Sequence, residues 1–376
     1  MSDNEQIASP GRDNDRQGFY LQKVMLKTMR VIHLASLGRF FPTLALGLIG
    51  GGLAYWLHLP LPWLLGAMIA TTVASLTGIP LRSPGKGRQG VLVVIGVMLG
   101  SAFTADMTGE AMRWGGSLAI MLIATAVMMA FSVWFSHRVA GHSWETSLYS
   151  GVPGGVSTVT VMALSSGADL RIIGITHAVR ILVLLLAIPP VLQFIGHVDI
   201  SGTAPALSQW LWMPDATDVA WLLAAGIAGI WLGKFLRLPS PLLFGPALVS
   251  AMLHFSGLTH AAVPAVIIAL AQVIIGISVG VRFAGAPMAE VGMAMLMAVI
   301  QALALLLLAI CAAWIGHLLT GYSAAAALLA YMPGGAPELS LVALSLGIDP
   351  AFVTTHHLLR ITLLVLLLPL LLRFQR

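Results

Sequence analysis

Long apolar stretches, separated by short polar turns that often hold proline or glycine, run along this chain from about residue 42 to residue 372. Most of them are long enough to cross a hydrocarbon core of about 30 Å as α-helices, since a helix rises about 1.5 Å per residue. The pattern therefore predicts an all-α polytopic membrane protein. The predicted segments lie at 42–58, 63–80, 89–105, 114–135, 146–167, 170–197, 219–236, 241–258, 265–284, 291–316, 321–347 and 351–372.

The apolar pattern occurs twice. Residues 149–180 resemble residues 331–360, and a shift of 180 positions carries a Pro-Gly-Gly triplet at 153–155 onto another at 333–335. Such a duplication, with matching interruptions in two apolar segments, is typical of transporters built from two repeats. The same shift also pairs Gly167 with Gly347, Asp169 with Asp349, His177 with His357 and Arg180 with Arg360.

The two Pro-Gly-Gly triplets interrupt their helices. Proline removes a backbone donor and glycine allows unusual dihedral angles, so helical hydrogen bonding stops at each triplet. In segment 321–347 about ten residues lie on either side of the break, and ten helical residues cover only about half of the hydrocarbon core. Each interrupted segment is therefore either a re-entrant hairpin or an unwound crossing helix, and both readings stay open.

The distribution of Lys and Arg indicates how the repeats are oriented. If the interrupted segments are hairpins, each repeat has five crossing helices, and Arg113 alone among the basic residues outside the apolar helices falls on the outer side. Six crossings would also place Arg171, Arg282 and two further cations outside. We therefore predict inverted repeats with both termini cytoplasmic. The predicted divisions are a cytoplasmic lead-in (1–41), membrane repeat 1 (42–197), an acidic periplasmic linker (198–218), membrane repeat 2 (219–372) and a cytoplasmic tail (373–376).

The composition excludes several other classes of protein. Only 9% of the residues are charged, against about 25% in soluble proteins. The single cysteine, Cys311, excludes a disulfide framework and a cysteine-based metal site. The net charge of +5 comes from residues near segment ends, where it sets orientation, so it does not indicate nucleic-acid binding.

Glu338 is the most informative side chain, because it alone among fourteen acidic residues lies inside an apolar segment. An ionisable group at membrane depth is expensive, so we interpret it as a proton- or cation-coupling site. The alternative is a structural partner for a buried arginine or for free N–H groups of a half-helix.

Arg180 and Arg360 lie about ten residues into their helices. They either bind an anionic substrate or cap the carbonyls exposed by the breaks. His177 and His357 are either proton relays or hydrogen-bonded residues of the bundle. Asp169 and Asp349 are expected to cap the helices that follow them. Together with backbone groups and hydroxyls at the breaks, the candidate substrate- or ion-binding residues are Glu338, Arg180, Arg360, Pro153, Gly154, Gly155, Pro333, Gly334, Gly335, Thr158, Ser340, His177 and His357.

The duplicated P-G-G…G-x-D…H-x-x-R segments, with an L-P-x-P-x-L-x-G element early in each half, resemble the AbrB membrane-protein family of Gram-negative bacteria over about residues 42–372. Members are often labelled as ammonia monooxygenases or as regulators of gene expression. The layout is similar to the superfamily that holds cation:proton antiporters and bile-acid symporters. That resemblance implies transport in the inner membrane and names no substrate.

Three functions compete. We expect an ion-coupled secondary transporter of a small solute, for which an anion is one candidate, with its site at the paired breaks. The alternative is a membrane-embedded regulator of gene expression without transport activity. A monooxygenase would need a convergent metal cluster, whereas the eleven histidines are scattered. We therefore expect no enzyme activity, cofactor or metal. The expected partners are the solute and the lipid bilayer, without nucleic acid, and a homodimer stays open.

Overall fold

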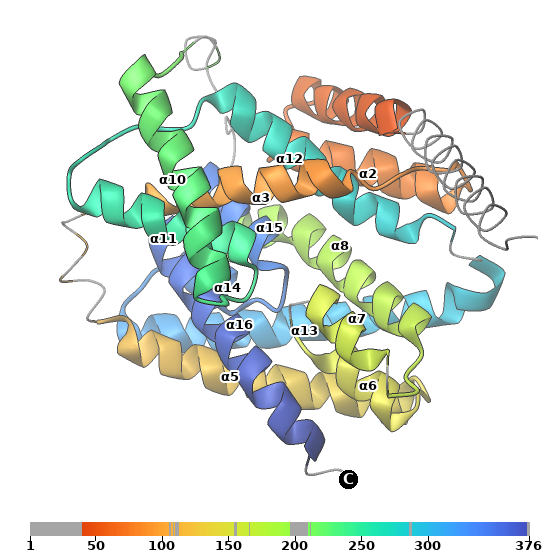
Figure 1. Cartoon of the computed structure of the whole chain (residues 1–376). Helices are drawn as coiled ribbons and strands as arrows, with labels where there is room; N and C mark the ends of the chain where they lie inside the picture. The colour runs from red at the N-terminus through yellow and green to blue at the C-terminus, as the bar shows by residue number, and fades with distance from the viewer. Residues whose placement is uncertain are drawn as a thin grey trace, which may run out of the picture.

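The computed structural model describes residues 40–104, 107, 109, 113–153, 156–164, 166–195, 210, 212–285 and 288–373. In this part of the chain all regular secondary structure is helical (Figure 1). Most of the expected lead-in and linker, and the end of the tail, lie outside the described residues. The labelled helices are α2 (Pro62–Leu76), α3 (Gly85–Gly100), α5 (Trp114–Trp134), α6 (Trp144–Gly151), α7 (Val156–Ala163), α8 (Leu170–Ile195), α10 (Ala216–Phe235), α11 (Pro241–Phe255), α12 (Ala265–Gly280), α13 (Met288–Thr320), α14 (Ala324–Tyr331), α15 (Ala336–Ser345) and α16 (Pro350–Arg373), with a π-turn η2 (Phe135–Val139) after α5 and a 3₁₀ turn η3 (Val281–Phe283) after α12.

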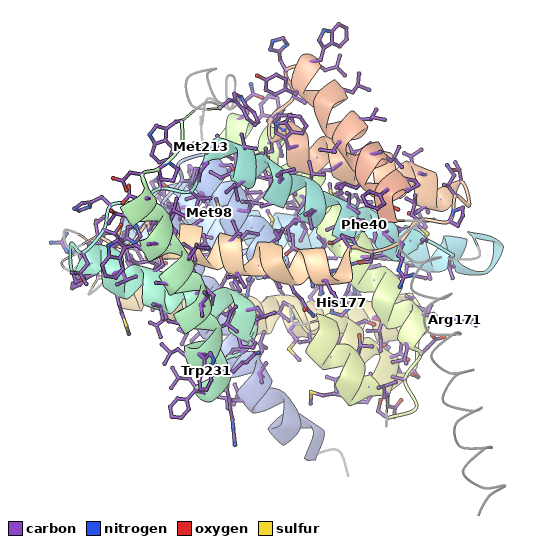
Figure 2. All side chains as sticks on the ribbon, turned by 45° about the horizontal axis from the view of Figure 1, so that its top comes forward. Phe40, Met98, Arg171, His177, Met213 and Trp231 are labelled. Carbon is purple, nitrogen blue, oxygen red and sulfur yellow. The ribbon has the colours of Figure 1, made fainter. Side chains whose placement is uncertain are left out.

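Six of the described helical segments are long and apolar enough to cross a membrane. Large apolar side chains also point away from the bundle, as Trp231 of α10 does in Figure 2, where 78% of its surface is exposed. Exposed tryptophan and phenylalanine on long apolar helices are expected of a surface that faces lipid. The multi-pass membrane fold predicted from the sequence is therefore supported. The six segments are Trp114–Val139, Leu170–Phe194, Ala216–Phe235, Ala265–Phe283, Val291–Thr320 and Pro350–Leu367.

Helices of the first half of the chain pack against helices of the second half. α2 lies along α12, and α3 lies along α11 (Figure 1). Glycine makes these approaches possible, because a Cβ on Gly96 of α3 would collide with the carbonyl oxygen of Leu243. A Cβ on Gly276 of α12 would likewise collide with the Leu64 carbonyl oxygen of α2.

The first Pro-Gly-Gly segment folds back on itself as a hairpin. The Tyr149 hydroxyl of α6 donates to the Met162 carbonyl of α7 at 3.4 Å. Beyond α7, the Asp169 N–H donates to Thr146 Oγ1 at the start of α6, at 2.9 Å. In one continuous helix residues 146 and 169 would stand roughly 35 Å apart. The chain therefore leaves this segment where it entered, and the hairpin is the correct one of the two readings.

The second interrupted segment, α14 and α15, returns in the same way. The ring of Tyr322, just before α14, stacks on Phe352 in the first turn of α16, with centroids 5.0 Å apart. The following helices begin as predicted, because Asp169 Oδ1 accepts from the Arg171 N–H at 2.8 Å and Asp349 Oδ1 accepts from the Phe352 N–H at 3.0 Å. Both capping predictions are confirmed.

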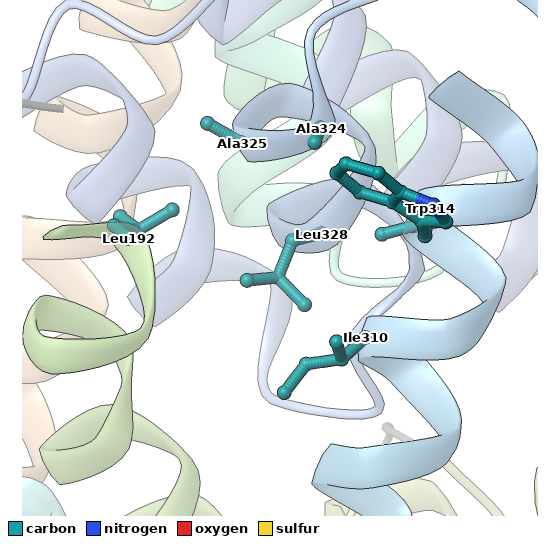
Figure 3. A pocket seen from close by; sticks show the side chains of 7 residues that line it. Leu192, Ile310, Trp314, Ala324, Ala325 and Leu328 are labelled. Carbon is teal, nitrogen blue, oxygen red and sulfur yellow. The ribbon is translucent and has the colours of Figure 1, made fainter. Parts of the chain in front are cut away.

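The two hairpins have their bases at opposite ends of α8. The first hairpin ends at Asp169, directly before α8 begins. Near the other end of α8, Leu192 meets the start of the second hairpin in a small apolar pocket that α13 closes (Figure 3). The 26 residues of α8 span about 39 Å, which is enough to cross a membrane. The lining residues of this pocket are Leu192, Ile310, Ala313, Trp314, Ala324, Ala325 and Leu328.

Candidate functional site

The second break places a buried carboxylate at the start of α15. Gly335 is the N-cap of this helix, Pro337 follows in its first turn, and Glu338 occupies the third helical position. A negative charge is favourable there because the helix N-terminus carries a partial positive charge. A Cβ on Gly335 would collide with the Glu338 carboxylate, so this glycine is what allows the side chain to fold back over the helix end.

Glu338 is only 2% exposed, and its Oε2 has no hydrogen-bond partner within the described residues. A buried acceptor without a partner is costly, so it marks a place where a ligand, an ion or a proton would stabilise the protein. The structure brings Glu338 close enough to Arg282 for their opposite charges to interact. The alternative role, as partner of Arg180 or Arg360, is not shown by any direct contact.

Arg180 and Arg360 hold the carbonyl groups that the two breaks expose. Arg180 Nη2 donates to the Val152 carbonyl at 3.0 Å. Arg360 Nη1 donates to the Met332 carbonyl at 2.8 Å, and the 180-residue shift pairs Met332 with Val152. Each guanidinium therefore caps a half-helix whose last carbonyls lack partners.

Capping does not use all of these donors. Arg180 is 2% exposed and Arg360 is 1% exposed, yet the Nε of each lacks a partner in the part of the chain that the structure describes. Arg180 also lines the cavity described below, whereas Arg360 is not among its lining residues. The geometry thus shows the capping role for both arginines and leaves Arg180 in reach of a ligand.

The histidines are held by hydrogen bonds inside the bundle. Figure 2 shows His177 in the interior, where its ring nitrogens face the carbonyls of Ile173 and Val152 at 2.9 and 3.2 Å. His357 Nδ1 lies 2.7 Å from Arg360 Nη2. A guanidinium only donates, so this nitrogen accepts and the ring proton sits on Nε2. His357 Nε2 is buried without a partner among the described residues. Both histidines are thus in contact with neighbouring groups of the bundle, and the choice between a structural role and a proton relay stays a prediction.

A cavity of about 390 Å³ joins these elements. It lies between the start of α3, the middle of α8, the start of α11, η3 and the second break. Of the predicted residues it gathers Glu338, Arg180, His177 and the triplet Pro333–Gly335. Its described lining is Arg88, Gln89, Leu92, His177, Arg180, Ile181, Ser240, Pro241, Leu242, Arg282, Pro333, Gly334, Gly335, Ala336, Pro337, Glu338 and Ile361.

Other predicted residues lie elsewhere. Ser340 is fully buried next to the site, and its Oγ has no partner in the described ranges. Pro153 is buried at the tip of the first hairpin. Gly154, Gly155 and the side chain of Thr158 fall outside the described residues, so the contribution of the first break stays a prediction.

The cavity contains two arginines that the sequence reasoning missed. From the sequence, Arg88 and Arg282 look like cations at segment ends that set orientation, whereas both line the cavity. Arg88 Nε and Arg282 Nη1 are buried without partners among the described residues. One signal was available for Arg282: it lies next to the predicted end of segment 265–284, and the matching residue of the other half is the uncharged Ala102.

The same region of the chain matches a known family. A family model described as "Transition state regulatory protein AbrB" matches residues 63–376, which include every described residue of the cavity lining. The chain belongs to the AbrB family. The resemblance inferred from the duplicated motifs is therefore confirmed.

Two relatives match most of the length of this AbrB-family chain. It is 29% identical over 323 residues to "Putative regulator AbrB" of Escherichia coli K12, which covers 84% of this chain and 90% of the relative. It is 24% identical over 348 residues to YhjN of Bacillus subtilis 168, which covers 87% of this chain and 90% of that relative. The likeness runs through nearly the whole membrane region.

Proposed function

We propose that this AbrB-family protein is an ion-coupled secondary transporter that carries a small anionic solute across the inner membrane. The observation that carries the proposal is the cavity at the second break, where Glu338 lies near several arginines with unused donors. Transporter sites are built in this way, at mid-membrane and between broken helices whose ends supply ligands. The proposal needs no cofactor, no metal and no nucleic-acid partner.

The packing supports an inverted arrangement of the two repeats. The 180-residue shift relates α2 to α11 and α3 to α12, so the contacts α2–α12 and α3–α11 exchange with one another under that shift. This exchange is what a two-fold relation between halves produces. Since the hairpins have their bases at opposite ends of α8, we place their bases on opposite sides of the membrane, with both termini cytoplasmic.

Alternating access follows from this arrangement. Arg180 stands about 15 Å along α8, where it binds the tip of the first hairpin and lines a cavity against the tip of the second. Each tip thus stands between the cavity and one side of the membrane. Rocking of one half against the other would open the cavity to each side in turn.

Glu338 is the proposed coupling group. Its carboxylate is buried, near a cation and without a partner for Oε2, so it can take up a proton or a cation when the cavity opens. The carboxylate and the solute share one cavity. The proton or cation that binds to the carboxylate therefore changes the affinity for the solute, and the solute changes the affinity for that ion. That mutual effect is what coupling requires.

The experiment is flux into proteoliposomes that contain the purified protein, with and without imposed proton and sodium gradients. Glu338→Gln keeps the size of the side chain and removes its charge, so we expect gradient-driven uptake to be lost while the protein still folds. The control is Glu145→Gln, which changes an exposed acid in the first turn of α6. Uptake by Glu338→Gln that still follows the gradient would contradict the coupling role.

A regulatory role is the second candidate, favoured by the printed name of the Escherichia coli relative. It would require a direct cytoplasmic partner. No flux of any anion from protein shown to be folded, together with a specific partner in cross-linking, would favour this role over transport.

A further inference from the structure

The formal charge of the cavity is not balanced. Three arginines and one glutamate line it within the described residues, which leaves an excess of two positive charges when all four are ionised. A neutral His177 adds no charge to this sum; its two ring nitrogens face backbone carbonyls, to which only one of them then donates. Buried charges without counter-charges are costly, so an excess of this size indicates that a ligand supplies the missing negative charge.

One carboxylate, Glu338, does not satisfy the three arginines that line the cavity with it. Arg282 lies within electrostatic range of both Glu338 and Arg88. Arg180 reaches the cavity from α8, with its Nη groups held by the carbonyls of the first hairpin. All three keep a buried N–H without a partner in the described chain, namely Arg88 Nε, Arg180 Nε and Arg282 Nη1. These donors come from three separate elements, so a single small charge would not serve them equally.

Much of the remaining wall is apolar, although Gln89, Ser240 and His177 also line it. Leu92, Ile181, Leu242 and Ile361 line the cavity together with three prolines. A volume of about 390 Å³ is within the range of pockets that hold organic ligands. An inorganic anion would leave these side chains facing water, whereas a hydrocarbon spacer would cover them.

We propose that the cavity binds a small organic dianion, in which two carboxylates are joined by a short hydrocarbon chain. Guanidinium groups bind carboxylates through paired, charge-assisted hydrogen bonds, and two carboxylates cancel the excess charge. The apolar walls accept the spacer. This inference rests on the proposed transport function, since it names the class of solute at the same site.

The test measures binding separately from transport. Succinate is the probe, and its comparison ligands are butyrate, sulfate and the dication putrescine. Binding to the purified full-length protein is followed by titration calorimetry in detergent. We expect succinate to bind at least about tenfold more tightly than butyrate or sulfate, because each of these lacks either one charge or the spacer. Putrescine should not bind.

Variants then identify the arginines involved. Arg282→Gln should reduce the preference for succinate over butyrate to less than about threefold. Arg88→Gln removes another cavity charge, from α3, and replaces the first variant if that one does not fold. Lys234→Gln, at an exposed position near the end of α10, is the control and should keep the wild-type preference.

The outcomes separate the two proposals. Succinate binding that Arg282→Gln weakens, without flux in proteoliposomes, would support the dianion site and contradict transport. Gradient-driven flux of a monocarboxylate or a cation would support transport and overturn the dianion. Equal binding of succinate and butyrate, stronger binding of sulfate, or no binding of any probe would each overturn the dianion inference.

Discussion

At the scale of single residues, the structure solves one problem in both halves by the same means. A helix that stops inside a membrane leaves carbonyl groups that water cannot reach. Arg180 and Arg360 satisfy those carbonyls from helices that follow about thirty residues later in the chain. Both guanidinium groups therefore cap the interrupted helices, whatever the cavity binds.

Arg360→Gln is therefore expected to destabilise the protein. Hydrogen bonds from a charged donor to the Tyr331 and Met332 carbonyls are lost, and such bonds contribute about 1.5–3 kcal/mol each. Thermal unfolding in detergent should move to a lower temperature, and Arg360→Lys should recover part of the loss. Arg138→Gln, at an exposed position, is the control. An unchanged unfolding temperature for Arg360→Gln would show that capping adds little.

Much of the site was predictable residue by residue. An acid within an apolar segment and two arginines at matched depth are visible in the letters, so Glu338, Arg180 and Arg360 could be named. Arg88 could not, because a cation near a segment end looks the same whether it faces solvent or a cavity, and for Arg282 the one signal was the uncharged Ala102 at the matching position. The sequence also does not show which arginine N–H groups lack a partner after capping. Distances and angles between elements that are remote in sequence decide this.

At the scale of elements, helices stand close enough together to depend on glycine. The sequence predicted where the apolar segments lie and where two of them break. It left open whether the broken segments cross or return, because the deciding contact, between Asp169 and Thr146, joins residues 23 positions apart through a side-chain hydroxyl. Proline and glycine stop a helix, but they do not set the direction in which the chain continues.

Gly245→Ala should weaken the packing of α10 on α11. A Cβ at this position would collide with the Gly229 carbonyl, a backbone group that cannot move aside without separating the helices. We expect a loss of about 1–3 kcal/mol in unfolding free energy. Gly52→Ala is the matched control, because its Cβ would meet nothing within 4 Å, and it should be neutral or slightly stabilising. Equal effects of the two substitutions would contradict a role for the close approach.

At the scale of the whole molecule, the two hairpins and α8 form one unit. Both hairpin tips reach the middle of α8, and their bases stand at its two ends. If α8 spans the membrane, the hairpins must open to opposite sides. The count of basic residues outside the apolar segments predicts the same orientation. That count depends on every crossing segment, because one wrongly assigned segment reverses the side of all the loops that follow it.

Cysteine labelling tests this orientation. In a Cys311→Ser background, single cysteines at Glu145 and Leu164 flank the first hairpin, and one at Thr320 precedes the second. A membrane-impermeant thiol reagent should reach the first two from one side and the third only from the other. Labelling of all three from the same side would exclude inverted repeats.

The position of Arg180 part-way along α8 has a consequence for an energised membrane. A unit charge that crosses a potential of 100 mV changes in energy by about 2.3 kcal/mol. A site near mid-depth would divide this drop, so each unit of charge on a solute would gain about 1.2 kcal/mol on entering from one side and lose as much on entering from the other. Voltage alone would then make the same cavity a tight site facing one compartment and a loose site facing the other.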